Sequence, residues 1–391
     1  MKLEPRIAAN HAELTSIRHD IHAHPELGFE EHRTSDIVAR KLKEFGCEVH
    51  TGIAKTGVVG TIRVGNSPRS VGFRADMDAL PMEELNTFDH RSQHQGRMHG
   101  CGHDGHTTML LGAAKYLAET RNFEGAVHFF FQPAEEGLGG GKVMVEEGMF
   151  EKFPCESIFG MHNRPSVPVG RFAIRSGPMM AAAGLFDIEI VGKGAHGARP
   201  ESGIDPVVVG GHIITAVQSI MARNVSPHDA GVISITQMHA GDAYNVIPER
   251  AVLRGTVRAF KPEVMDKIKT GIERICRGAA TMFGAKVTPD VRVIYPALVN
   301  NADEAKFAAD IAASIVGEEN VDRNGPLVMG SEDFSFMLNA CPGAFILIGN
   351  GEGESACEVH NPKYDFNDKI LPLGATFFAR VAETKLAKPP A

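Results

Sequence analysis

The sequence predicts an α/β protein in which a domain built on a mainly parallel sheet carries a smaller α+β domain as an insertion. Three observations support this fold class. Strand-like and helical segments alternate from residue 48 to residue 162, with polar side chains directly after several strands. The chain has 391 residues, more than one hydrophobic core usually serves. Between residues 184 and 295 the elements change to the order strand, helix, strand, strand, helix, strand.

The first elements along the chain are helical. Apolar residues recur at helical spacing from Ile7 to His24, and a second helix follows and is closed by Gly46. Three short runs with strand composition come next, separated by glycine, asparagine and proline, over residues 48–51, 57–64 and 71–74. These elements predict two packed helices beside the start of a sheet.

Further strands of the predicted sheet end in polar residues. A helix is expected over residues 107–119, and strands are expected over residues 127–131 and 157–161. The first of these strands leads into Glu135 and Glu136, and the second leads into His162. Open α/β sheets hold their ligands at the carboxyl ends of the strands. We therefore expect the functional residues along this edge of the sheet.

Residues 184–295 are predicted to form the inserted domain, and residues 1–183 and 296–391 the domain around it. The inserted strands are expected over residues 186–191, 232–239, 251–259 and 286–294, and the long helices over 204–223 and 262–283. This order is that of a two-layer, ferredoxin-like sandwich. The outer domain resumes with a helix over residues 304–316, a strand over 345–348 and a helix over 371–386.

The composition excludes several classes of partner. A formal net charge of -8 argues against nucleic acid and membrane surfaces and favours a small-molecule substrate. No apolar run approaches the roughly 18 residues of a membrane-spanning helix, and the start of the chain lacks the order of a signal peptide. We therefore expect a soluble, cytoplasmic protein. The six cysteines are scattered, with no CxxC pair, which favours reduced thiols over disulfides.

The stretch Met98–Thr108 is dense in side chains that bind metals. It places three histidines, one thiol and one carboxylate among glycines. We expect a tight loop here rather than a packed core, because each buried polar group would need a partner. Thiolate and imidazole bind Zn²⁺, Co²⁺ and similar ions, which makes Cys101 and His103 candidate ligands. The other polar residues of the stretch are assigned supporting roles: His99, Asp104 and His106.

The adjacent carboxylates Glu135 and Glu136 predict a division of labour. Neighbouring side chains at a strand end point in different directions, so one can bind a metal while the other takes a proton from water. With two single histidines at the ends of other elements, the chain supplies five ligands, a number that suits two ions sharing one bridge: Cys101, His103, Glu136, His162 and His360. Cys357, three residues before His360, is a rival thiol ligand.

Other catalytic patterns are absent from the sequence. Residues 137–142 look like a phosphate-binding loop but lack its first glycine, and Val143 stands where Ser or Thr is needed. There is no His-Glu-x-x-His, no Gly-x-Ser-x-Gly, and no dinucleotide-binding glycine motif after a strand. Metal-dependent hydrolysis is the favoured interpretation, and a non-catalytic metal-binding protein of the same fold is the alternative from another class.

Several motifs resemble the signatures of the M20 metallopeptidase and amidohydrolase family, particularly its hippurate hydrolase, N-acyl-amino-acid amidohydrolase and IAA-amino acid hydrolase-like branch. They span nearly the whole chain and cover residues 22–28 (HAHPELG), 74–81 (RADMDALP), 101–107 (CGHDGHT), 132–137 (QPAEEG) and 330–334 (GSEDF). Residues 194–198 (GAHGA) and 245–248 (NVIP) of the inserted domain also look like family motifs.

The resemblance implies a zinc-peptidase-like catalytic domain with two divalent metal ions per subunit, which could be Zn, Mn, Co or Ni, and with Glu135 as general base. Asp78 would orient the site, and His196 would stabilise the oxyanion in its own or the partner's site. Asn245 and Arg258 would hold the substrate carboxylate. The inserted domain would act as a lid and form the contact of a homodimer or a dimer-based homotetramer.

The predicted activity is hydrolysis of N-acyl or N-aroyl amino acids to a carboxylic acid and an amino acid. A dipeptidase or aminopeptidase of the same group is the alternative, and it would need an anchor for a free substrate amine, which the sequence does not identify. Asp76 and Cys101 stand where other branches of the superfamily use different ligands, so the identity of the metal stays open.

Overall fold

The computed structural model describes residues 1–165, 167–351 and 357–388, and the chain forms two compact units. The first unit comprises Met1–Gly177, Val299–Pro326 and Asp333–Ala391. The second comprises Pro178–Leu298 and Leu327–Glu332, and it contains the residues for which the sequence predicts an insertion. No helix in the described part of the chain is both long enough and apolar enough to cross a membrane.

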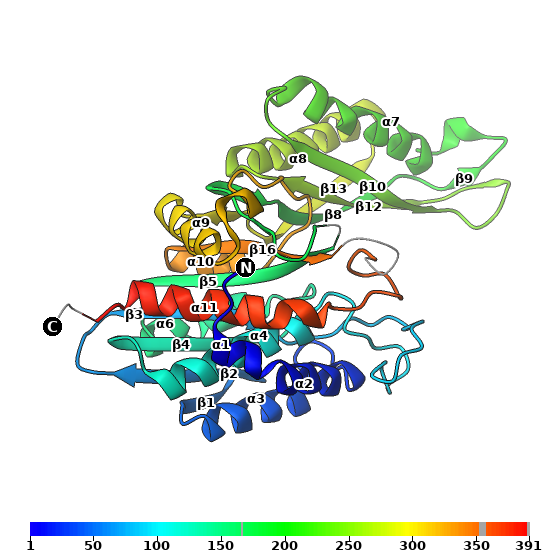
Figure 1. Cartoon of the computed structure of the whole chain (residues 1–391). Helices are drawn as coiled ribbons and strands as arrows, with labels where there is room; N and C mark the ends of the chain where they lie inside the picture. The colour runs from blue at the N-terminus through cyan, green and yellow to red at the C-terminus, as the bar shows by residue number, and fades with distance from the viewer. Residues whose placement is uncertain (166, 352–356, 389–391) are drawn as a thin grey trace. The chain divides into compact units, whose positions relative to one another are not determined.

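The first unit contains an eight-stranded sheet in the order β1-β2-β4-β3-β5-β16-β6-β15 (Figure 1). Its strands are β1 (Glu48–Ile53), β2 (Gly57–Val64), β3 (Ser70–Asp76), β4 (Gly125–Gln132), β5 (Ser157–Pro165), β6 (Phe172–Ala173), β15 (Val321–Asp322) and β16 (Gly343–Gly351). The four central strands, β4, β3, β5 and β16, are parallel to one another. The outer strands β1 and β2 are antiparallel additions.

The central strands are buried because they are apolar on both faces. Every residue of β3 and β4 is buried, which is typical of parallel strands covered by helices on both sides. The Phe73 ring lies in the middle of this core, with its centroid 5.3 Å from that of Phe378 in α11 (Leu371–Lys385). The edge at which these strands end is thus supported by a rigid apolar layer.

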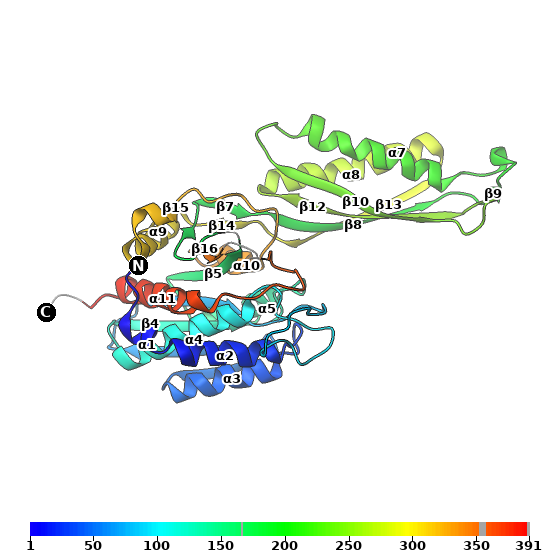
Figure 2. The same cartoon turned by 45° about the vertical axis from the view of Figure 1, so that its right-hand side comes forward.

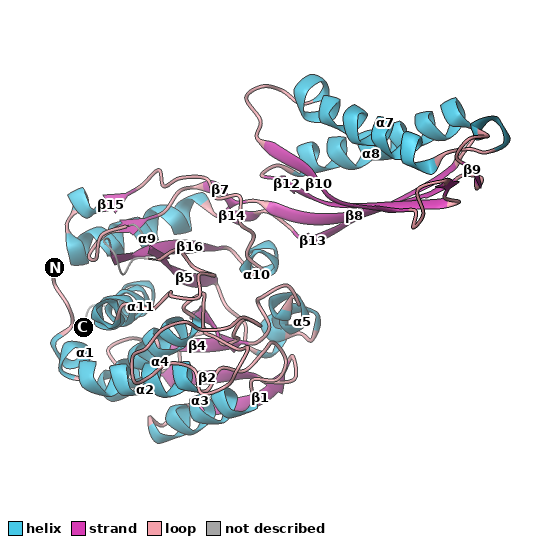
Figure 3. Ribbon diagram, turned by 90° about the vertical axis from the view of Figure 1, so that its right-hand side faces the viewer, coloured by secondary structure: helices cyan, strands magenta, loops and turns pink. Residues whose placement is uncertain are grey.

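Helices lie on both sides of this sheet, as Figure 3 shows. On one side α4 (His103–Thr120) packs against α11, α2 (His11–Ala23) and α3 (His32–Glu44). On the other side α5 (Gly140–Glu146) packs against α10 (Phe334–Ala340). The other helices of this part are α1 (Pro5–Ala9), α6 (Met149–Lys152) and α9 (Ala302–Val316), and the short strands β7 (Gly177–Met180) and β14 (Leu298–Asn300) pair where the chain passes between the two units.

The second unit is a two-layer sandwich. Its sheet has the order β10-β12-β8-β13 with antiparallel neighbours, and α7 and α8 lie together on one face (Figure 2). Along the chain the elements are β8 (Ala182–Val191), α7 (Pro206–Ser219), β10 (Gly231–Ala240), β12 (Arg250–Ala259), α8 (Pro262–Phe283) and β13 (Lys286–Tyr295). This is the ferredoxin-like order that the sequence predicts. The predicted fold class is confirmed.

Several element boundaries differ from the prediction. The helix expected from Ile7 to His24 is two helices, α1 and α2, which meet at Asn10. The helix expected over residues 204–223 ends at Ser219 and continues as a π-helix, Ile220–Asn224. Neither α5 nor α10 was predicted, because helices of seven residues are too short for apolar periodicity to be read.

Candidate metal centre

The stretch Met98–Thr108 is not the loop that the sequence predicts. Helix α4 begins at His103, directly after Gly102. Gly102 has a φ of 94°, a left-handed conformation that glycine adopts without strain, and a Cβ at this position would collide with the amide of Asn163. A left-handed turn and the first turn of a helix therefore bring Cys101 and His103 together.

The polar side chains of this stretch are buried, although we expected a packed core to exclude them. Four of them are at most 1% exposed: His99, His103, Asp104 and His106. Other buried polar groups supply most of their partners. His22 Nδ1 lies 2.8 Å from Asp104 Oδ2, and His106 Nδ1 lies 2.6 Å from Asp76 Oδ1. Burial lowers the pKa of His99 to about 4, so this histidine is neutral.

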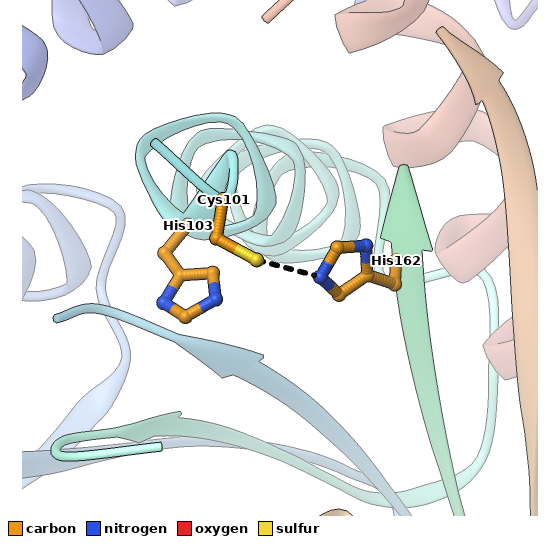
Figure 4. A group of neighbouring side chains, drawn as sticks. All are labelled: Cys101, His103 and His162. Atoms are coloured by element: carbon orange, nitrogen blue, oxygen red, sulfur yellow. Dashed lines mark hydrogen bonds between the residues drawn. The ribbon is translucent and has the colours of Figure 1, made fainter. Parts of the chain in front are cut away.

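Cys101, His103 and His162 form one group of neighbouring side chains (Figure 4). Cys101 precedes α4, His103 is the first residue of α4, and His162 belongs to β5 rather than following a strand that ends at residue 161. Cys101 Sγ lies 3.3 Å from His162 Nε2. His162 Nδ1 donates to the main-chain oxygen of Asn163 at 2.7 Å, so the Nε2 lone pair faces Cys101.

Asp78 contacts two of the predicted ligands. His103 Nδ1 lies 2.9 Å from the main-chain oxygen of Asp78 and 3.2 Å from its Oδ1. Asp78 Oδ2 accepts the backbone N–H of Glu136 at 2.9 Å. Because Nδ1 faces Asp78, Nε2 lies on the other side of the His103 ring, and it carries a lone pair when the ring is neutral. One carboxylate thus fixes both an imidazole ring and the backbone of a neighbouring turn.

Glu136 and His360 complete the cluster. Glu136 Oε1 lies 3.3 Å from His360 Nε2 and 4.0 Å from His103 Nε2. Cys101, Glu136 and His360 offer ligand atoms that all lie within 4.8 Å of one another. The backbone N–H of His360 donates to the oxygen of Gly100 at 2.7 Å, which fastens this turn next to Cys101. The structure therefore brings the five predicted ligands together in overlapping groups.

The donor set fits divalent metal ions. It combines thiol, imidazole and carboxylate groups, which together suit borderline cations such as Zn²⁺. Among the described residues, His103 Nε2 is buried and has no hydrogen-bond partner, and the buried Glu136 Oε1 lies 4.0 Å from it and pairs with His360 Nε2 at 3.3 Å. A buried polar atom without a partner, such as His103 Nε2, is rare, because losing the partner of a buried polar group costs about 1–3 kcal/mol. A cation held between these two atoms would satisfy both.

The pKa values in the cluster are strongly shifted. Burial and the nearby Glu136 carboxylate raise the pKa of the Cys101 thiol. Contacts with Cys101 and Glu136 raise the pKa of His360 to about 10. Burial and the neighbouring His106 lower the pKa of His162 well below its usual range. Metals bind thiolate and neutral imidazole, so a bound cation would oppose the shifts at Cys101 and His360.

Glu135 lies beside these ligands in the turn after β4. Its side chain is nearly buried, and its Oε1 accepts the backbone N–H of Asp333 at 3.4 Å. A carboxylate oxygen of Glu135 lies within 4.8 Å of ligand atoms of His103 and Glu136. Both adjacent carboxylates therefore reach the cluster, as is required if Glu136 is to bind metal and Glu135 is to take a proton from water.

Sequence reasoning gave no role to the polar network under the cluster. Arg74 donates to Asp76 Oδ2 at 2.8 Å and to Asp333 Oδ1 at 3.0 Å. Gln132 Nε2 donates to the Asp333 carboxylate at 2.8 Å. These residues all lie in the motifs noted in the sequence, and their place in those motifs was the signal that could have indicated a role for them. A motif does not say which residues meet across the sheet, so their pairing required the structure.

Arg18 joins segments that carry different ligands of the cluster. Its guanidinium is fully buried and contacts three carboxylates at 2.7–3.4 Å: Asp104, Asp365 and Asp368. The first of these follows His103 directly, and the other two follow His360. His22 adds a second buried contact, because its two ring nitrogens lie 2.8 Å from Asp104 and 3.2 Å from Glu84. This network fixes the two segments relative to each other.

We expect His22 to make the stability of the metal-free protein depend on pH. Burial alone would lower its pKa, but hydrogen bonds to Asp104 and Glu84 raise the pKa of His22 to about 9. This value exceeds the unfolded value of about 6.5, so the stabilisation is complete below pH ~6.5 and is lost as the pH rises through about 9. The shift corresponds to roughly 3 kcal/mol.

Urea unfolding of the wild type and of His22→Gln between pH 6 and pH 10, both with chelator, measures this effect. The free energy of unfolding should fall more steeply with pH in the wild type than in His22→Gln. Other groups titrate in both proteins, so their contributions cancel when the free energies of unfolding of the two proteins are subtracted. Equal pH dependence in the two proteins would contradict the assignment.

The rival ligand Cys357 lies outside the candidate ligand groups found among the described residues. Its side chain is partly buried against the hydrophobic core of the first unit. The remaining predicted site residues belong to the second unit. His196 is exposed in the short ribbon of β9 (Ala195–His196) and β11 (Val246–Ile247), and the main-chain oxygen of Asn245 accepts the N–H of Gly197.

Arg258 is half-buried in β12, where its guanidinium donates to the main-chain oxygen of Val257 at 2.9 Å. Burial lowers the pKa of Arg258 from its usual value. This arginine still carries its charge, because the pKa of a guanidinium starts above about 12. The roles of His196, Asn245 and Arg258 toward a substrate stay predictions.

Comparisons with known proteins agree with the motifs. The model of peptidase family M20/M25/M40 matches residues 72–384. The chain is 44% identical over 384 residues to a hippurate hydrolase of Campylobacter jejuni, covering 98% of this chain and 99% of that protein. It is 40% identical over 373 residues to the IAA-amino acid hydrolase ILR1-like 2 of Arabidopsis thaliana, covering 94% of this chain and 84% of that protein.

A solved structure shows the same fold. The YXEP protein of Bacillus subtilis, described as a dinuclear metal-binding peptidase from the M20 family, matches with a TM-score of 0.85 and 33% identity over 97% of this chain and 99% of that chain. The resemblance noted in the sequence is confirmed, and this relationship agrees with a donor set suited to divalent metal. The chain belongs to peptidase family M20/M25/M40.

Proposed function

We propose that this protein is a metal-dependent amidohydrolase that cleaves N-acyl or N-aroyl amino acids, such as N-benzoylglycine, into a carboxylic acid and an amino acid. The observation that carries the proposal is the cluster of five ligand-type side chains with Glu135 beside it, which gathers residues from the end of β4, from β5, from the start of α4 and from the turn at His360. The relatives named hippurate hydrolase and IAA-amino acid hydrolase support this substrate class.

The proposed metal ligands hold two divalent ions, of Zn, Mn, Co or Ni: Cys101, His103, Glu136, His162 and His360. When bound, such ions lower the pKa of water and polarise a substrate carbonyl. Asp78 serves the site by position, since it holds the His103 ring through Nδ1 and the Glu136 backbone through its N–H. We expect the neutral imidazoles to present Nε2 toward the ions.

Glu135 is the proposed general base. Its carboxylate takes a proton from the attacking water and later gives it to the leaving amine nitrogen, so that the base is restored. The backbone N–H of Asp333 orients one of its oxygens. Low exposure of the carboxylate favours this role, because exclusion of bulk water strengthens its interactions with the reacting groups.

The second unit supplies the proposed substrate contacts. His196 donates a hydrogen bond to the developing oxyanion, in its own or the partner's site. Asn245 and Arg258 hold the substrate carboxylate, for which the forked guanidinium is suited because it can donate two parallel hydrogen bonds. We further propose that residues 184–295 act as a lid and as the contact of a homodimer or dimer-based homotetramer, in a cytoplasmic enzyme with a small-molecule substrate.

A panel of matched substrates tests the function. We expect the protein with Mn²⁺, Co²⁺ or Zn²⁺ bound to release amino acid from N-benzoylglycine or from N-acetylated amino acids, and to act poorly on unblocked dipeptides such as glycylglycine. The expected difference arises because a free amine has no identified anchor, whereas a blocked amine needs none. Faster release from the unblocked dipeptides would favour a dipeptidase or aminopeptidase. No release from any N-acyl compound at full metal occupancy would refute the amidohydrolase.

A further inference from the structure

Glu31 is a fully buried carboxyl group for which the proposed mechanism has no use. Its Oε1 accepts the backbone N–H of Ala134 at 2.8 Å, and its Oε2 accepts the hydroxyl of Thr56 at 2.6 Å. A buried carboxyl group is costly, so both contacts are needed to keep it in the fold. One of them ends on the residue directly before Glu135.

Ala134 has an unusual backbone conformation. Its φ is 55°, in the left-handed region, which costs an L-residue other than glycine about 1–2 kcal/mol. This angle sets the direction in which Glu135 and Glu136 leave the end of β4. A conformation that is unfavourable for alanine persists only when its surroundings hold it, and the Glu31 contact does so directly at the Ala134 N–H.

The surroundings of this turn are tight, which explains why Ala134 needs a protein partner. A Cβ at Gly28 would lie 3.0 Å from the Ala134 Cα, and a Cβ at Gly140 would overlap the carbonyl of Pro133. The main-chain oxygen of Ala134 accepts the N–H of Gly140 at 2.9 Å. Ala134 itself is completely buried, so removal of Glu31 would leave its N–H without an acceptor.

A role in helix capping does not account for Glu31. It precedes α3, but its side chain makes no capping hydrogen bond to that helix. The carboxylate of Glu26 does so instead, because it accepts the backbone N–H groups of Arg33 at 3.0 Å and Thr34 at 2.8 Å. The two neighbouring carboxylates therefore have separate tasks, and Glu26 provides a matched control.

We propose that Glu31 is a positioning residue for Glu135 and Glu136, which acts by holding Ala134 in its left-handed conformation. The inference rests on the proposed function for the roles of those two carboxylates. Burial raises the pKa of Glu31 to about 7, yet the carboxylate and the carboxylic acid both keep an acceptor oxygen for the Ala134 N–H. A glutamine at this position also keeps an acceptor oxygen for the Ala134 N–H.

Three variants test the proposal. In Glu31→Ala, kcat should fall by about 100-fold, since displacement of catalytic groups by about 1 Å has effects of that size. KM should change little, and bound metal after dialysis should fall below that of the wild type, because Glu136 moves too. Glu31→Gln should recover most of the activity and metal. Glu26→Ala should lower thermal stability with kcat and metal content unchanged.

The conformation of Ala134 gives an independent test. In the double variant Glu31→Ala/Ala134→Gly, glycine adopts the left-handed angle without the cost that alanine bears, so kcat and metal content should partly recover. If Glu31→Ala does not fold, the double variant decides, because the proposal expects it to fold and bind metal. A double variant as impaired as Glu31→Ala would overturn the proposal.

Two further results separate this inference from the proposed function. A folded Glu31→Ala protein with wild-type kcat and metal content would overturn the inference alone. If the wild type hydrolyses no amide at all, the proposed function fails, but metal content of the same variants still tests whether Glu31 positions the turn.

Discussion

Glu135→Gln is expected to lower kcat by about 10²–10⁴-fold while metal content stays at the wild-type value. That range is typical for loss of a general acid–base group. The amide has nearly the same shape as the carboxylate but cannot take a proton from water. It should leave the metal in place, because Glu135 is not one of the five proposed ligands. Steady-state kinetics with N-benzoylglycine and metal analysis of the dialysed protein measure both quantities.

Glu136→Gln is the matched control for this prediction, because it changes the adjacent carboxylate in the same way. It should lower metal content as well as activity, since Glu136 Oε1 lies near both His360 and His103. Full activity in Glu135→Gln would mean that the roles of the two carboxylates are exchanged or that neither is the base. A non-catalytic metal-binding protein would show no turnover to lose.

Cys101→Ser is expected to reduce metal affinity by more than about 100-fold and to abolish activity at limiting metal. Loss of a group that only orients a ligand already costs about 10–100-fold, and a thiolate ligand should contribute more. A serine hydroxyl is a poorer ligand for borderline ions than a thiolate. Titration of the metal-free protein with Zn²⁺ in competition with a chelating dye measures the affinity.

Cys47→Ser is the control, because Cys47 and Cys101 are both 8% exposed and both belong to the first unit. Cys47 packs in the hydrophobic core, so its replacement should lower stability and leave metal affinity unchanged. Similar metal affinities in the two variants would show that Cys101 is not a ligand, and Cys357 would then become the thiol to test.

The best-predicted elements are those with a glycine or proline at their ends. The strand β2 and the helix α8 have the predicted bounds, Gly57–Val64 and Pro262–Phe283. Both are strongly periodic segments next to a glycine or proline, which marks where the element begins or ends. The start of α4 was placed four residues late, at residue 107 instead of His103. Histidines and glycines are poor helix formers, and only the burial of their polar groups against α2 and β3 makes this first turn stable.

The five ligands could be selected from the sequence because few types of side chain bind metal, and two of them, Glu136 and His162, could be placed near each other because parallel strands end at one edge of a sheet. The residues that hold them were harder to predict. The contact of Arg74 with Gln132, for example, depends on β3 and β4 being neighbours, and the sequence does not determine the strand order. The Glu31 contact depends on a left-handed Ala134, and sequence patterns assign that conformation to glycine or asparagine rather than to alanine.

The most direct test of the account is a metal titration of activity. Metal-free protein receives increasing Mn²⁺, Co²⁺ or Zn²⁺ while the hydrolysis of N-benzoylglycine and N-acetylated amino acids is followed. The account predicts that no product forms without metal and that the hydrolysis rate rises to a plateau at about two ions per chain. Two ions is the number that five ligands can hold when the ions share one bridging group. Full activity without metal, or no product from any of these compounds at the plateau of binding, would contradict it.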